Sequence, residues 1–179
     1  VEAGLLWFIY ISAYKEAFTC ADTVKDCDSS WAYYGGGETV NGATGFAKYV
    51  KALSNSVHAD TFDALLGVRC WRDLDAGESA VNTMLHAQVL EQLDRSLDRG
   101  LALILASRIE TLRALAPEQA EELNAGKSFL RILGPVSHRA FTSHNPTLAQ
   151  EIAPLWSGEL DDGVLEALLD ALNSTFDCA

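Results

Sequence analysis

Apolar residues recur at every fourth position through the middle of the chain. The row consists of Val81, Leu85, Val89, Leu93, Leu97, Leu101, Leu105 and Ile109. Because residues four apart share one face of an α-helix, the row predicts a long helix over residues 79–116 that other helices cover. Each step advances by about 400°, so the row drifts by roughly 40° per step. The helix must therefore bend or meet different neighbours at its two ends.

Two features lie in the middle of this helix. Residues 101–105 are apolar on every side, which predicts that they form the centre of the core. Gly100 precedes them, and glycine costs about 1 kcal/mol relative to alanine in a helix interior. We therefore expect either a bend at Gly100 or the close approach of another part of the chain.

Shorter helices are predicted on both sides of the long one. We expect them over residues 2–20, 23–34, 60–71, 117–133, 147–154 and 161–176. Gly35 is the expected left-handed cap of the second, and Asp60 the expected N-cap of the third. Residues 36–56 should be mostly loop with one helical turn near 46–53, and residues 136–145 should be an irregular connection. No segment alternates with period two, so the sequence predicts an all-α fold. Residues 1–179 should form one domain, a bundle of about six or seven helices around the long one.

Composition narrows the classes of partner. The chain has 179 residues, 49% of them hydrophobic, and a formal net charge of −12. Such a surface repels nucleic acid and anionic lipid, but it is compatible with binding cations. The apolar stretch at residues 4–11 is too short to span a bilayer, which needs roughly 20 residues, so we expect a buried first helix and no membrane span.

Four cysteines, an even number, allow two disulfides. A local Cys20–Cys27 bridge is favoured because these residues flank a polar, turn-like stretch, which leaves Cys70 and Cys178 to tie down the C-terminus. Oxidised cysteines would place the protein outside the cytoplasm, secreted or periplasmic. The alternative is four reduced, buried thiols in a cytosolic protein.

Two groups of residues are candidate metal ligands. Glu78, Asn82 and His86 lie four apart and would form one polar row on the long helix, where carboxylate, amide and imidazole could hold a divalent metal. The alternative is a solvated face with one surface histidine. His138 and His144 lie in the expected irregular connection, where a loop could bring their imidazoles together. The alternative is two exposed or capping histidines. The sequence contains no Glu-x-x-His pair, which argues against a ferritin-like di-iron centre.

An aromatic group precedes a glycine-rich stretch. Trp31, Tyr33 and Tyr34 could form a binding platform beside three successive glycines. The alternative is that these aromatic residues belong to the core. No nucleophile motif such as Gly-x-Ser-x-Gly occurs, so we expect a protein without catalytic residues.

The same stretch carries a resemblance to a known family. The run Trp31-Ala32-Tyr33-Tyr34-Gly35-Gly36-Gly37-Glu38, the later Arg69-Cys70-Trp71, and Asn82 before Leu85 and Val89 are together similar to segments of the secreted, low-iron-inducible iron-assimilation proteins of algae and their bacterial relatives. The likeness extends over residues 13–115, with one copy of the pattern where algal members often hold more. Residues 136–179 have no match in that family.

The resemblance implies an extracytoplasmic helical protein linked to iron acquisition, but it assigns no iron ligand. Together with the cysteines and the candidate metal ligands, the resemblance predicts a secreted or periplasmic, disulfide-bearing helical protein that binds a divalent cation such as iron. The alternative is a structural, self-assembling subunit or a protein-interaction module. Its partner would then be a second copy or another protein.

Overall fold

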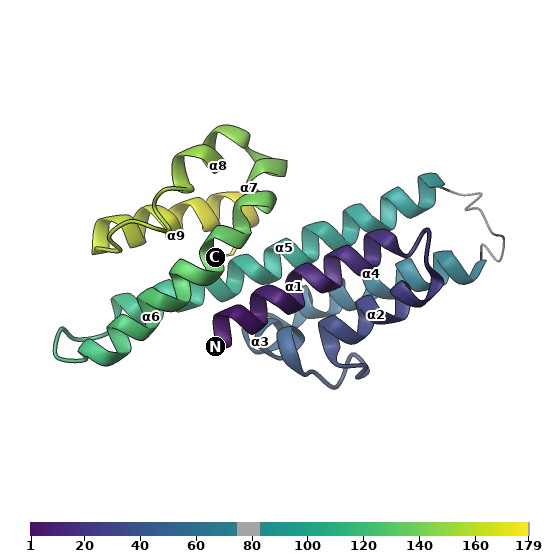
Figure 1. Ribbon diagram of the computed structural model, residues 1–179, viewed down its shortest axis with the longest axis horizontal. Coiled ribbons are helices and arrows are strands. Elements are labelled where there is room, and N and C mark those ends of the chain that lie inside the picture. Colours follow the sequence, from purple (N-terminus) through teal and green to yellow (C-terminus); the bar gives the residue numbers. More distant parts are fainter. Residues whose placement is uncertain (75–82, 179) are drawn as a thin grey trace. The chain divides into compact units, whose positions relative to one another are not determined.

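The structure is a computed structural model that describes residues 1–74 and 83–178. These residues form helices and contain no strand, so the predicted all-α class is confirmed. The chain groups into two compact units, and the expectation of a single domain stays a prediction. Unit 1 comprises Val1–Trp7 and Leu101–Ala179, and unit 2 comprises Phe8–Gly100. Figure 1 labels the helices of both units.

Unit 2 is a bundle formed by the first five helices. They are α1 (Glu2–Thr19) from Phe8 onward, α2 (Val24–Gly35), α3 (Gly45–Leu53), α4 (Asn55–Leu74) and the first part of α5 (Thr83–Arg113). Its core consists of aliphatic and aromatic side chains with less than 3% of their surface exposed, among them Tyr10, Ala13, Tyr34, Phe46, Val50, Leu65, Val68, Leu93 and Leu97. The buried Tyr10 hydroxyl donates a hydrogen bond to Asp98 on α5, which joins α1 to α5.

Unit 1 contains the start of α1 up to Trp7, the rest of α5 and the C-terminal helices. They are α6 (Ala120–Leu133), the 3₁₀ turn η1 (Gly134–Ser137), α7 (His138–His144), α8 (Pro146–Ile152) and α9 (Asp162–Phe176). Leu105, Ile109, Leu130, Phe141, Trp156 and Leu172 are among its fully buried residues. Gly134 is required here because a Cβ at that position would overlap the Trp156 ring.

The apolar row on α5 is buried as predicted from Leu93 onward. Leu85 and Val89 are half-buried, and Val81 lies outside the described residues. The boundary between the units falls at Gly100, so the two ends of α5 meet different neighbours, as the drift of the row requires. A Cβ on Gly100 would lie 2.9 Å from Cγ2 of Val50, so the close approach of α3 accounts for the glycine.

Several predicted boundaries are wrong for local reasons. The left-handed cap of α2 is Gly36, with φ of 69°, and Gly35 still belongs to the helix. Helix α4 begins at Asn55, so Asp60 lies inside it. Residues 45–53 form a complete helix, and residues 136–145 are mostly helical. Buried apolar residues such as Phe46 and Phe141 hold these short segments as helices, although their polar neighbours are typical of loops.

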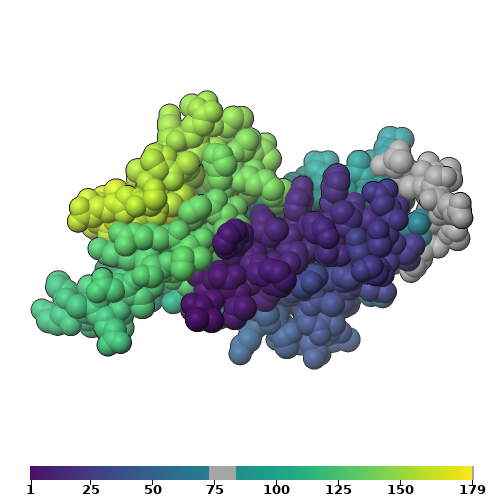
Figure 2. Space-filling view, viewed as in Figure 1, coloured from purple at the N-terminus to yellow at the C-terminus, as the bar shows by residue number. Residues whose placement is uncertain are grey.

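Helix α1 is not fully buried, contrary to the expectation for residues 4–11. One face of α1 is buried and carries side chains such as Tyr10, Ala13 and Ala17. The opposite face exposes large apolar side chains, each 38–60% exposed: Leu5, Trp7, Phe8, Ile11 and Phe18. Figure 2 shows α1, in purple, at the surface. We call these residues the α1 apolar face. Among the helices of the described residues, none combines the length and apolar character that a bilayer-spanning segment needs.

Candidate functional site

The candidate site of unit 2 is a stacked pair of rings, Trp71 near the end of α4 and His86 near the start of α5. The ring centroids lie 3.8 Å apart and the planes are 10° from parallel. Both side chains are buried, with 2% of Trp71 and 9% of His86 exposed. The stack fixes the imidazole in one plane.

The surroundings of His86 determine its protonation state. Burial lowers the pKa of the imidazole below its ordinary value of 6.5, while a hydrogen bond with the Ala17 backbone and the charge of Asp22 oppose that shift. His86 is therefore neutral at pH 7. Its Nε2 atom is buried and has no hydrogen-bond partner among the described residues. No polar atom of the described residues therefore satisfies Nε2.

A neutral histidine held in this way has the features of a metal ligand. Histidines that bind metals usually donate their other ring N–H to a carbonyl or carboxylate, which fixes the tautomer. The two other members of the predicted row, Glu78 and Asn82, lie outside the described residues. Within residues 1–74 and 83–178, no group of three or more histidine, cysteine or acidic side chains could hold a metal ion. Of the predicted row, the described structure shows one member, His86.

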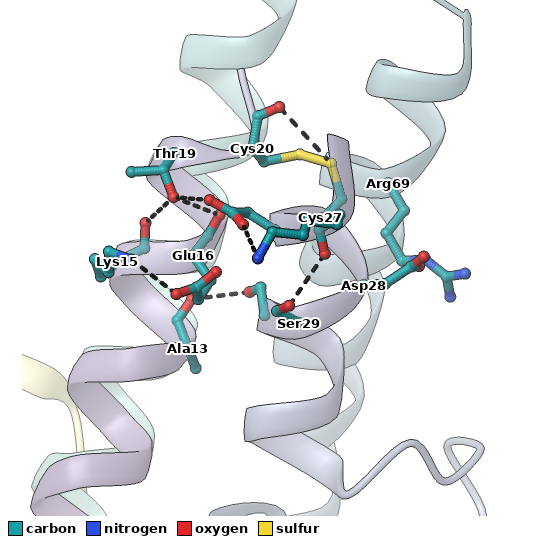
Figure 3. Close-up of a disulfide and its surroundings, with 12 residues drawn as sticks. Ala13, Lys15, Glu16, Thr19, Cys20, Cys27, Asp28, Ser29 and Arg69 are labelled. Carbon is teal, nitrogen blue, oxygen red and sulfur yellow. Dashed lines mark hydrogen bonds and ion pairs between the residues drawn. A yellow bond between two sulfur atoms is a disulfide. The ribbon is translucent and has the colours of Figure 1, made fainter. Parts of the chain in front are cut away.

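A disulfide lies in the same part of unit 2. Cys20 and Cys27 are bonded as predicted, which ties the end of α1 to the first turns of α2. Figure 3 shows the polar contacts around the bridge. The Thr19 hydroxyl donates to the buried Asp26 carboxylate at 2.6 Å, and this hydrogen bond lowers the pKa of Asp26. The bridge and these contacts hold the last turn of α1, which carries the Ala17 carbonyl.

The second predicted bridge is absent. Cys70 is an exposed thiol on α4 and Cys178 lies half-buried after α9, and they are not bonded to each other. Cys70 belongs to unit 2 and Cys178 to unit 1. The Cys70–Cys178 pairing was predicted only because these two cysteines were left over. That reasoning says nothing about the distance between their sulfur atoms in the fold.

The predicted aromatic platform does not form. Trp31 packs against Phe62, with ring centroids 4.1 Å apart, and the Arg69 guanidinium lies over it. Tyr33 is partly exposed and contacts the edge of Phe8. Tyr34 is buried. The three rings diverge because consecutive residues of a helix are separated by about 100°.

Tyr34 instead reveals a buried pair that the sequence reasoning missed. Its hydroxyl lies 3.1 Å from Nδ1 of His58, whose Nε2 lies 3.0 Å from the Val40 carbonyl. A carbonyl only accepts, so Nε2 carries the proton and the tyrosine donates to Nδ1. Burial raises the pKa of Tyr34 and keeps it neutral. His58 thus attaches the glycine-rich segment to α4. The helix was predicted to begin at Asp60, after His58, so the sequence offered no reason to place His58 on a helix.

The second pair of predicted metal ligands is also not brought together. His138 and His144 are the first and last residues of α7, so they are about 9 Å apart along the axis and point in different directions. Both are exposed, and the ring of His144 lies 5.2 Å from Phe176. The prediction assumed a loop, but the segment is helical. His138 and His144 therefore do not form a joint metal site.

Comparison with known proteins finds no relative. No family model matches the chain, and no curated protein and no solved structure matches it. The resemblance of residues 31–38 and 69–71 to iron-assimilation proteins therefore stays a prediction.

Proposed function

We propose that this protein is an extracytoplasmic helical binding protein that takes up a divalent cation, iron among them, with Nε2 of His86 as its first ligand. The observation that carries the proposal is the unpartnered, buried Nε2 of a neutral, stacked histidine. A buried nitrogen without a partner costs about 1–3 kcal/mol, and a cation that accepts its lone pair would remove that cost. Glu78 and Asn82, which precede His86 at four-residue intervals, are proposed to complete the site.

Other properties of the chain support this proposal. A net charge of −12 attracts cations. The Cys20–Cys27 disulfide is typical of an oxidising compartment, so it supports a secreted or periplasmic location. The likeness to iron-assimilation proteins supports iron as the cation.

The test is anaerobic titration with Fe(II) and with Zn(II), followed by isothermal calorimetry and by the melting temperature. Binding should raise the melting temperature, because a ligand that binds only the native state stabilises it. His86→Phe retains a ring against Trp71 but removes both nitrogens, and it should abolish the gain. His144→Phe, at an exposed histidine of unit 1, is the matched control and should leave the gain intact. If neither metal raises the melting temperature of the natural chain, or if His86→Phe keeps the full gain, the proposal is wrong.

The α1 apolar face favours a second function, self-assembly. Its residues lie within about 160° of the helix circumference, and monomeric proteins rarely expose large contiguous apolar patches. A second copy of the chain would bury this face. Sedimentation velocity should then show a concentration-dependent oligomer, which Phe8→Ser and Phe18→Ser together should dissociate. Met84→Ser, at a side chain that is 73% exposed on α5, is the control and should have no effect. A strict monomer at high concentration would contradict this function.

A further inference from the structure

The imidazole of His86 covers the face of the Trp71 indole. The ring centroids are 3.8 Å apart, the planes are 10° from parallel, and both side chains are buried. Stacked rings are separated by about 3.5 Å, the contact distance of carbon atoms, so the two rings are shifted sideways by only about 1.5 Å. The two rings therefore overlap face to face, and the contact is not between a face and an edge.

This geometry fixes how far a cation at Nε2 would lie from the indole. A metal bound to a ring nitrogen lies in the plane of the imidazole, about 2.1 Å from the nitrogen and about 3 Å from the ring centroid. Because the two rings are nearly parallel and overlap, that cation is about 4–6 Å from the indole centroid, whichever way Nε2 points. This separation is within the range of cation–π contacts.

The attraction to the indole arises only when the cation binds. Burial lowers the pKa of His86, so the free imidazole is neutral and the stack joins two uncharged rings. A coordinated cation brings positive charge beside the electron-rich face of the indole, which is the best aromatic partner for a cation. The bound state alone gains this attraction, so the indole adds to the affinity. The negative charge of Asp22 also acts on His86 and favours a cation there.

From the stack and the burial of both rings, we infer that Trp71 belongs to the cation site: its indole covers one side of a divalent cation bound at Nε2 of His86 and attracts it through the π face. This inference rests on the proposed function. It adds a residue of α4 to a site otherwise assigned to the row that ends at His86 on α5. It also predicts that the wall on the α4 side of the cation is an aromatic ring, where a solvated site would have water.

The first test records the near-ultraviolet difference spectrum of the full chain on addition of Zn(II). Zn(II) has a filled d shell and contributes no absorption of its own, so the spectrum reports the aromatic side chains. A charge beside the indole should shift the Trp71 band, and Trp71→Phe should abolish that shift. His86→Phe keeps a ring on Trp71 without a ligand and should also abolish it. Cys70→Ser should give the shift of the natural chain, which excludes the neighbouring exposed thiol as its source.

The second test measures the affinity for Zn(II) and Fe(II) by anaerobic calorimetry. Trp71→Leu keeps an apolar side chain but removes the π face, and it should weaken binding about tenfold. Trp71→Phe restores a π face and should bind within about threefold of the natural chain. Trp31→Leu is the matched control, because Trp31 is another indole of unit 2 that packs on a ring, that of Phe62 at 4.1 Å, and it should leave the affinity unchanged.

Three results would overturn the inference while the proposed function stands. They are binding by the natural chain without a shift of the Trp71 band, natural affinity of Trp71→Leu, and an equal loss of affinity in Trp31→Leu. If the natural chain binds neither metal, the proposed function fails and the inference fails with it. Far-ultraviolet circular dichroism checks that each variant is folded. If Trp71→Leu is not folded, the difference spectrum decides, because it needs only the conservative Trp71→Phe.

Discussion

Reduction of the Cys20–Cys27 disulfide should destabilise unit 2 by an amount that follows from the size of its loop. The bridge joins residues that are seven apart, and closing so short a loop removes about 8 cal/mol/K of entropy from the unfolded chain. At 25 °C this corresponds to about 2.5 kcal/mol. Both half-cystines are buried, with 0% and 5% of their surface exposed, so the folded state should retain its packing when the bond is broken.

Urea unfolding with and without dithiothreitol, followed by circular dichroism, measures this difference. With a urea m-value of about 1–3 kcal/mol/M, the midpoint should fall by roughly 0.8–2.5 M on reduction. The Cys20→Ala, Cys27→Ala double variant should reproduce the loss and should no longer respond to dithiothreitol. Cys70→Ser, which removes an exposed thiol, is the control and should unfold like the natural chain. The reasoning is refuted if reduction leaves the midpoint unchanged, or if Cys70→Ser shifts it equally.

Three further changes test the packing and electrostatics of unit 2. Gly100→Ala should lower the free energy of unfolding by about 1–2 kcal/mol, because overpacking against the stiff side chain of Val50 outweighs the gain in helix propensity; a more stable variant would contradict this. Tyr34→Phe should cost about 1–3 kcal/mol, because it leaves Nδ1 of buried His58 without its donor, and a neutral result in urea unfolding would contradict that hydrogen bond. Asp26 has a lowered pKa, so its contribution to stability is present above the ordinary value of 3.8 and is lost as the pH falls through the lower folded value. Asp26→Asn should therefore make stability less dependent on pH below about 4, and an unchanged dependence in acid titration would contradict the assignment.

The sequence predicts the helices with a strong period better than those without one. The four-residue row of α5 is long enough to identify that helix, and burial from Leu93 onward follows from it. Only one helical turn was expected near residues 46–53, because glycine, asparagine, threonine and serine are frequent in residues 36–56, and residues 136–145 were expected as an irregular connection. Isolated helices of this length are marginal in water, so they form only because buried side chains such as Phe46 and Phe141 hold them against neighbours.

The candidate site, too, has features that the sequence predicts and features that it does not. Cys20–Cys27 could be predicted because a bridge over seven residues is a local property. His86 could be singled out from its position on the helix, but its stack on Trp71 joins residues of two helices, and no spacing rule shows that contact. The buried pair of Tyr34 and His58 was missed for the same reason.

Local patterns in the sequence were sufficient for the all-α class, the buried part of α5 and one disulfide, because each depends on residues within a few turns of one another. Tertiary structure alone decided which face of α1 is exposed, where the chain divides into two units, and which nitrogen of His86 has no partner. Helix α1 is apolar almost all round, so its own sequence cannot select the face that is covered. That choice depends on the shapes and charges of segments distant along the chain, which only the packed structure brings together.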